Sequence, residues 1–592
     1  MADSPLEFFK AELQVENTAQ RIENLQRAKL IAAALGPART VSDLLPLLRE
    51  VQNTTEDEFL FCLAEQYQVL ADFIGGEENL HLLVPPLDNL VSQEETVVRE
   101  RAAQSISALP EKCKTQEVRE KLVRDHIFPL VKRLAEGEWF TCRVAATGLL
   151  ALCYRDCGTE ERTELRTVFV KLCEDETPMV RRAAAASMKG VFMEVEKQFI
   201  TAELLRTFKT LAADDTQDSI RVSCLQAALE LARVLSPEES RQHTLPILSA
   251  AHEDPSWRVR LALATGLDGL IKTVGPEITM SYLLNPFQNL LKDPESDVRA
   301  AAVTVIEKAI NDFSVDQLTT FIIPAFQPLS LDSAQSVRAA LANVVGPVAR
   351  KIGREATMRL LLPLIQDLMK DDFHDVRLNV VCHAGEICEV MGSDQVSHSI
   401  LTTVQTLTAD QQWRIRLAVV EQIPRLARHF GSETFQASLE GIFLEALGDS
   451  VWTVRETTLN QIETLASVFG EQWVADNLVP RILKEMKETT FAHRVTGLRA
   501  LIPLSRVLDT EQVEAQLLGV VLSALKDSVP NVRFAASRVA AQMASSGALT
   551  SHAVESRVKP VLAQLAGSDS DVDVVYFAGK ALVQCDEGPR KK

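Results

Sequence analysis

Apolar and polar positions along the chain follow one pattern that recurs about every 39 residues. Residues 254–275 are its clearest copy. An Asp-Pro turn comes first, and apolar side chains such as Val259, Leu263 and Leu270 follow at the spacing of one helical face. Gly275 then stands where the helix should end, because glycine takes a positive φ without penalty. This stretch predicts a turn, a helix and a glycine stop.

An arginine directly after the first apolar position marks the phase of the pattern. From Arg221 to Arg533 every step is 39 residues, and Leu60 and Tyr576 fill two further places. Self-similarity at such a period indicates an array of supersecondary units, here fifteen repeats. The arginines are Arg21, Arg99, Arg143, Arg181, Arg221, Arg260, Arg299, Arg338, Arg377, Arg416, Arg455, Arg494 and Arg533.

Other residue types keep the same phase. Aspartates such as Asp215 and Asp449 precede the arginine, although Glu488 replaces one of them; prolines lie further upstream, and glycines such as Gly158 and Gly431 follow it. Each repeat is therefore predicted to be a helix A kinked by proline, a turn with the aspartate, and a helix B beginning near the arginine. The aspartate should accept backbone N–H groups, and the arginine should reach an aspartate of the adjoining repeat. This ladder is structural rather than catalytic.

These columns resemble HEAT repeats, which predicts an all-α fold, an α-α superhelix (solenoid) of about fifteen repeats. The repeat count and the turns E-W-F-T-C-R (residues 138–143), S-W-R-V-R (256–260) and Q-Q-W-R-I-R-L-A (411–418) resemble the family of protein phosphatase 2A scaffolding A subunits. The resemblance implies one array over residues 1–592 that is not an enzyme and needs no cofactor. It also implies that repeats 1–8 (residues 1–315) bind an interchangeable regulatory B subunit, and that repeats 11–15 (residues 394–592) bind the phosphatase catalytic subunit. Heterodimers, heterotrimers, and a cytoplasmic and also nuclear location are expected.

Composition narrows the possible functions. Hydrophobic residues make up 46% of the 592 residues but aromatic residues only 5%, which suits helix pairs packed by aliphatic side chains. A net charge of −19 disfavours nucleic acid or anionic membranes as general partners. We expect no signal peptide and no run near the roughly 18 apolar residues of a membrane span. The ten cysteines are scattered and predict reduced core residues.

Catalytic and metal-binding motifs are not found in the sequence. Gly579-Lys580 lacks the upstream glycines of a phosphate-binding loop. Residues 569–573 begin like a calcium loop, but Val574 and Lys580 occupy the positions that need glycine and glutamate. No metal site or cofactor is therefore expected.

Tryptophan marks the candidate binding surface, since four of the five tryptophans fall in the turn between helices A and B. The rings could instead fold back onto the next turn as packing. The alternative is a ridge of aromatic and arginine anchors, the composition of binding hot spots. Carried over from the resemblance, the predicted regulatory-subunit-binding residues are Trp139, Phe140, Pro178, Met179, Arg182, Ser256, Trp257 and Arg258. The predicted catalytic-subunit-binding residues are Trp413, Arg414, Trp452, Phe491, Pro530, Asn531, Asp573 and Tyr576.

Two other classes of protein were weighed. Nuclear transport receptors of the importin-β type are also acidic and built of HEAT repeats, but they are longer, less regular, and carry an acidic loop insertion that this chain lacks. An enzyme with a helical-repeat body would need a catalytic insertion, and steps of 39 residues leave no space for one.

Overall fold

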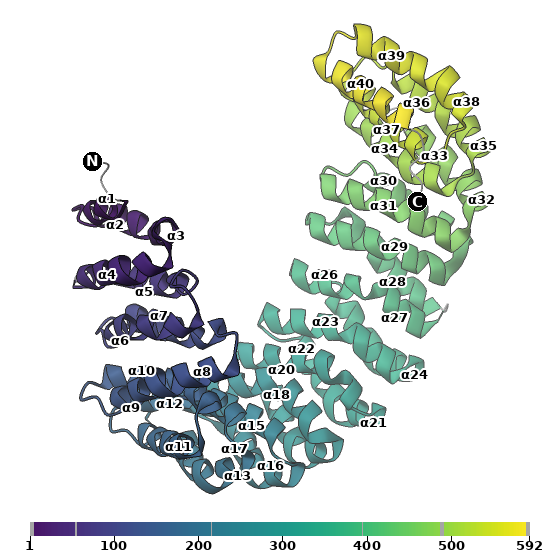
Figure 1. Ribbon diagram of the computed structural model, residues 1–592. Coiled ribbons are helices and arrows are strands. Elements are labelled where there is room, and N and C mark those ends of the chain that lie inside the picture. The colour runs from purple at the N-terminus through teal and green to yellow at the C-terminus, as the bar shows by residue number, and fades with distance from the viewer. Residues whose placement is uncertain (1–4, 54–55, 215, 393–394, 486–489, 588–592) are drawn as a thin grey trace. The chain divides into compact units, whose positions relative to one another are not determined.

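The computed structural model describes residues 5–53, 56–214, 216–392, 395–485 and 490–587, and no strand occurs within these ranges. The chain forms two compact units, Met1–Leu290 and Leu291–Lys592. Each unit consists of stacked helix pairs (Figure 1), and the fold is an all-helical HEAT-repeat solenoid. The predicted region boundaries at residues 1, 394 and 592 lie outside the described residues.

In the first unit, every residue that marks the repeat phase lies in a helix B. The B helices are α2 (Thr18–Leu25), α5 (Asp57–Leu70), α7 (Thr96–Ala108), α10 (Phe140–Asp156), α12 (Pro178–Glu194), α15 (Asp218–Val234) and α18 (Trp257–Ile278). The other α-helices are α1 (Pro5–Glu12), α3 (Ala28–Arg39), α4 (Leu45–Val51), α6 (Val84–Val91), α8 (Gln116–Leu122), α9 (Phe128–Ala135), α11 (Thr159–Cys173), α13 (Lys197–Phe199), α14 (Leu205–Ala212), α16 (Pro237–His243), α17 (Leu245–Ala250) and α19 (Leu284–Leu290).

The second unit continues the same order of elements. Its B helices are α20 (Ser296–Ala309), α23 (Gln335–Ile352), α26 (His374–Cys382) with α27 (Ala384–Met391), α29 (Trp413–Thr434), α31 (Trp452–Phe469), α34 (Phe491–Val507), α37 (Pro530–Ser545) and α40 (Val572–Glu587). The other α-helices are α21 (Val315–Gln317), α22 (Phe326–Ser330), α24 (Arg354–Ala356), α25 (Leu362–Leu368), α28 (Gln395–Thr406), α30 (Glu440–Ala446), α32 (Glu471–Trp473), α33 (Val479–Glu485), α35 (Thr510–Gln512), α36 (Leu518–Ala524), α38 (Ser551–Ala553) and α39 (Lys559–Ser568).

Helix A is broken as predicted, but proline is not the whole reason. A π-helical turn interrupts it, and in η1, η4, η11, η14 and η16 that turn ends two residues before a proline. The wider turn accommodates a residue that has no N–H and would clash with an α-helical carbonyl. The same turn occurs in η5, η13 and η15, where Arg206, Gly441 and Gly519 occupy the proline position. The bend therefore belongs to the repeat, and proline fits it. The π-turns are η1 (Thr40–Leu44), η4 (Val123–Ile127), η5 (Ile200–Leu204), η7 (Thr279–Leu283), η9 (Leu318–Ile322), η11 (Thr357–Leu361), η13 (Phe435–Leu439), η14 (Val474–Leu478), η15 (Val513–Leu517) and η16 (Val554–Val558).

Short 3-10 helices make up most of the remaining ordered turns. They are η2 (Glu77–Leu83), η3 (Pro110–Lys112), η6 (Ala251–Glu253), η8 (Ile310–Asp312), η10 (Ile323–Ala325) and η12 (Leu407–Ala409).

The predicted glycine stops are confirmed at most repeats. Gly275 and Gly431 have φ values of 81°, with extended ψ, a backbone conformation that only glycine adopts readily. Gly158 differs, since its φ is −77° and it is the residue before α11. The expectation that Gly158 is a left-handed stop is therefore wrong, because α10 there ends in an extended residue, Cys157.

The core is formed between neighbouring B helices and between each B helix and its own A helix. α12 packs against α15, α20 against α23, and α29 against α31. Leucine, isoleucine, valine and alanine dominate the buried side chains, as composition predicted. Most cysteines are buried and all are free, and burial raises the pKa of Cys224 to about 12. The described residues contain no metal-binding cluster of histidine, cysteine and carboxylate side chains.

One stretch departs from the expectation about membrane spans. By length and composition, Ala28–Val51 is apolar enough to cross a membrane. However, Gly36 breaks the helix with a φ of 76°, and the π-turn η1 follows. Leu44 and Leu48 are fully buried in the repeat. These features fit a packed A helix of the solenoid.

Candidate functional site

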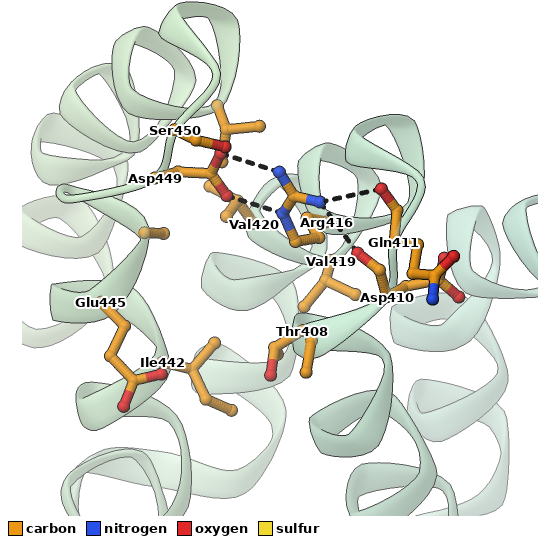
Figure 2. Close-up of a pocket in the computed structure, with 13 residues that line it drawn as sticks. Thr408, Asp410, Gln411, Arg416, Val419, Val420, Ile442, Glu445, Asp449 and Ser450 are labelled. Atoms are coloured by element: carbon orange, nitrogen blue, oxygen red, sulfur yellow. Dashed lines mark hydrogen bonds and ion pairs between the residues drawn. The ribbon is translucent and has the colours of Figure 1, made fainter.

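The turn between helices A and B is held by the predicted ladder of arginine and aspartate. In Figure 2, Arg416 lies between two turns and bonds to both. Its Nε and Nη2 donate to the Asp449 carboxylate of the next repeat at 2.7 and 2.9 Å, and its Nη1 donates to the Asp410 carbonyl of its own turn at 2.8 Å. Asp449 also accepts the Val451 N–H at 2.8 Å, which caps α31. One arginine therefore closes its own turn and holds the next one.

The same rung recurs in both units. Within the described residues, the N–O distances run from 2.6 to 3.3 Å for Arg143–Asp175, Arg181–Asp214, Arg221–Asp254, Arg299–Asp332, Arg338–Asp371, Arg377–Asp410, Arg416–Asp449, Arg494–Asp527 and Arg533–Asp569. The prediction that arginine reaches the adjoining aspartate is confirmed at these rungs.

Electrostatics strengthen each rung. The Arg416 hydrogen bonds, working against burial, hold the pKa of Asp449 below its usual value of 3.8. The same contact raises the pKa of Arg416. Both groups are therefore charged at neutral pH, and the hollow of about 380 Å³ beside them is lined by this structural pair rather than by unpaired catalytic groups.

Three positions depart from the predicted ladder. Asp215, which the spacing selected, lies outside the described residues, and Arg181 pairs with Asp214 instead. Glu488, the acidic residue expected opposite Arg455, also lies outside them. Arg99 is 6% exposed and donates to the Gln93 and Glu94 carbonyls, with no hydrogen bond to a carboxylate in the described structure.

The predicted binding residues gather at one place in each repeat, the first turn of helix B. Helices begin at Phe140, Pro178, Trp257, Trp413, Trp452, Phe491 and Pro530. Trp139 and Ser256 each directly precede the first residue of their helix. Helix B thus starts three residues before the marker arginine, and the aromatic side chains form a series along the helix starts. We call this series the turn ridge.

In the first unit, the turn ridge is strongly exposed. Trp139 is 73% exposed, Met179 and Arg182 are exposed, and Pro178 is half-buried. Trp257 is half-buried, and the Arg258 guanidinium lies 5.1 Å from its ring centre. Ser256, beside it, donates to Asp218 at 2.8 Å.

In the second unit, several of the predicted anchors are partly used for packing. Trp413 is half-buried against Val420, Ala446 and Val454, with Arg414 4.8 Å from its ring centre. Trp413 is thus not the freely exposed turn residue that the sequence suggested, because its ring also covers the junction with the next repeat.

The other predicted residues of the second unit are more open. Tyr576 is 61% exposed, and Phe491, Asn531 and Asp573 are exposed, while Pro530 is half-buried. Trp452 is 45% exposed, although the guanidinium groups of Arg455 and Arg499 lie 5.4 and 4.2 Å from its ring centre.

Sequence analysis missed two residues of this surface. Val572, the first residue of α40, is 82% exposed, and Phe373, the residue before α26, is 45% exposed. Both hold the frame position of the tryptophans, so the spacing to the next arginine or its substitute was the signal that would have selected them.

Comparison with known proteins gives matches to the same family over part of the chain. The regulatory A subunit of Schizosaccharomyces pombe protein phosphatase PP2A is 38% identical over 270 residues, which is 45% of each chain. The 65 kDa regulatory A subunit of Arabidopsis thaliana serine/threonine-protein phosphatase 2A, alpha isoform, is 40% identical over 201 residues, 34% of this chain and 33% of the relative. The chain is a HEAT-repeat protein similar to the A subunits of protein phosphatase 2A. The matched segments span less than half the length of these relatives.

Two family models match the central region. A PPP2R1A-like HEAT repeat model matches residues 276–353, and a PIK3R4-like middle-domain model matches residues 351–453. Among solved structures, yeast importin-β (Kap95p) has a TM-score of 0.62 at 15% identity, and the match covers 99% of this chain and 79% of that one. At this identity the likeness shows the fold alone.

Proposed function

We propose that this protein is a non-catalytic scaffold of a protein phosphatase 2A holoenzyme, holding a catalytic subunit on repeats 11–15 and an interchangeable regulatory B subunit on repeats 1–8. The observation that carries the proposal is the similarity of 38 to 41% to regulatory A subunits, one of which, from human, is a 65 kDa beta isoform. A Dictyostelium discoideum relative, 36% identical over 204 residues, is named as a protein phosphatase 2A scaffold subunit. On this proposal the protein works in the cytoplasm and the nucleus.

The turn ridge supports the proposal in physical terms. Exposed tryptophan, tyrosine, phenylalanine and arginine side chains are the usual anchors of protein interfaces. The arginine–aspartate ladder fixes the spacing between successive anchors. A scaffold of this kind raises the effective concentration of one bound partner near the other and sets their orientation.

The decisive experiment measures binding of each purified phosphatase partner to matched variants. Phe491→Ala with Tyr576→Ala should weaken catalytic-subunit binding by about thirtyfold, the effect of losing roughly 2 kcal/mol at an anchor. Trp139→Ala with Phe140→Ala should weaken binding of a regulatory subunit but leave catalytic-subunit binding unchanged. Met193→Ala and Val583→Ala are the controls, because these apolar side chains are 60% and 58% exposed but lie near the other ends of α12 and α40.

The results also separate the main alternative, a transport receptor of the importin-β type. Such a receptor would bind the GTPase Ran and show no affinity for either phosphatase subunit. The structural likeness to importin-β does not favour this function, because it rests on the fold at 15% identity. Binding to Ran without binding to a phosphatase catalytic subunit would overturn the scaffold proposal.

A further inference from the structure

A groove on the B helices of the last three repeats lies apart from the turn ridge. It crosses α34, α37 and α40, which pack in succession within the second unit (Figure 1). The hollow is about 420 Å³, within the size range of ligand pockets. Its lining includes Arg499 and Ile502 of α34, Phe534 and Arg538 of α37, and Phe577, Lys580 and Gln584 of α40.

Two aromatic rings form the apolar part of this groove. The ring centres of Phe534 and Phe577 are 5.2 Å apart with an interplanar angle of 32°. The Arg538 guanidinium lies 4.3 Å from the centre of the Phe577 ring. Stacking of this kind orients the guanidinium plane and leaves its N–H groups at the edge free to donate.

The cations in the groove are only partly neutralised. Arg499 donates to both oxygens of Glu456 at 2.9 and 2.8 Å and is held against Trp452. Arg538 and Lys580 are exposed, and neither forms a hydrogen bond or an ion pair with another described residue. No aspartate or glutamate is among the lining residues. In a chain of net charge −19, three cations around two aromatic rings make a local site for an anionic partner.

We propose that this groove binds an acidic peptide segment of a protein partner, with an aromatic or aliphatic side chain seated on the rings of Phe534 and Phe577. Carboxylates beside that side chain accept charge-assisted hydrogen bonds from Arg538 and Lys580. Arg499 is a positioning residue that supplies a third positive charge. The site is separate from the turn ridge, so the proposal does not rest on the scaffold function.

A nucleic acid fits this groove less well than a peptide. Phosphate-backbone binding needs a long track of cations, and the protein as a whole is strongly acidic. An acidic peptide matches the short cluster of three cations and the apolar floor at once. A single-stranded oligonucleotide is therefore included in the test as the competing ligand.

The test measures binding of the full chain to a short fluorescein-labelled peptide in which aspartates and glutamates surround one phenylalanine. Three comparison ligands are the same peptide with asparagine and glutamine in place of the acids, the same peptide with alanine in place of phenylalanine, and an oligothymidylate of equal charge. Arg538→Glu with Lys580→Glu, and the milder Arg538→Gln with Lys580→Gln, remove the two unpaired cations. Arg428→Glu with Arg557→Glu is the charge-matched control, because both arginines are exposed and outside the groove.

The acidic peptide should bind, its affinity should fall as salt rises, and both groove variants should lose at least about tenfold in affinity. The control variant and Phe491→Ala, on the turn ridge, should bind the peptide with affinity close to that of the parent chain. Circular dichroism establishes that each variant is folded. Equal binding by the parent and both groove variants, tighter binding of the oligonucleotide, or no peptide binding up to about 1 mM would each overturn the proposal.

Discussion

Arg99 in the third repeat and Arg416 in the eleventh occupy the same position of the repeat but have different partners. Arg416 donates to the Asp449 carboxylate of the next repeat, and this contact raises its pKa. Arg99 donates to two carbonyls and a threonine hydroxyl of its own turn, and burial lowers its pKa. The position that would supply its aspartate is Gly137. The comparison teaches that turn closure and linkage between repeats are separate functions of one arginine.

The largest expected effect comes from breaking the Arg416–Asp449 pair. Asp449→Ala removes the charged acceptor of Arg416 and the cap of the Val451 N–H, which should cost about 2–3 kcal/mol. Arg416→Ala combined with Asp449→Ala should cost less than the sum of the single changes. Hydrogen exchange of α29 and α31 with thermal unfolding measures both effects. Additive costs would contradict a direct coupling.

Arg99→Ala is the matched test in the region without the pair. It should lose the hydrogen bonds that close its own turn, and the loss of protection should stay within the third repeat. Faster exchange that spreads to α10 as strongly as Asp449→Ala spreads from α31 to α29 would remove the distinction between the two arginines.

A second difference separates the tryptophans of the two units. Trp413→Ala should lower the free energy of unfolding by about 2 kcal/mol, because the ring covers Val420, Ala446 and Val454. Trp139→Ala should change it by no more than about 0.5 kcal/mol, because 73% of that residue is exposed. Differential scanning calorimetry of the two variants without partners checks this. Equal losses would show that exposure does not distinguish the two anchors.

Much of the fold follows from the sequence, and the failures have physical reasons. The period alone places Arg416 near Asp449 and puts Gly431 after a helix, because both depend on spacing within one repeat. The half-burial of Trp413 depends on how the next repeat packs, which spacing does not define. The groove around Arg538 depends on three stacked helices, so no local pattern announces it.

The glycine stops extend the comparison to helix ends. Gly431→Ala should cost about 1–3 kcal/mol, because a φ of 81° with an extended ψ strains any residue with a Cβ. Gly158→Ala should cost less than about 1 kcal/mol, since its φ is −77° and the added Cβ meets only the end of the Glu161 side chain. Thermal unfolding of both variants measures the difference. A larger loss for Gly158→Ala would mean that the backbone conformation is not what selects glycine here.

The smallest effect is the pH dependence of a single rung. The pKa of Asp449 is lower in the folded protein than its usual 3.8, so the rung contributes stability that is fully present above that value and is lost as the pH falls through the folded pKa. Asp449→Asn removes the titrating group but keeps a similar shape. The gap in melting temperature between the parent and Asp449→Asn should therefore be constant from about pH 7 to about pH 5 and should narrow below about pH 4. Arg99 has no carboxylate partner, so Arg99→Gln should show a gap that does not change over the same range. A gap for Asp449→Asn that stays constant down to about pH 3 would mean that the charge on Asp449 does not stabilise the junction between the eleventh and twelfth repeats.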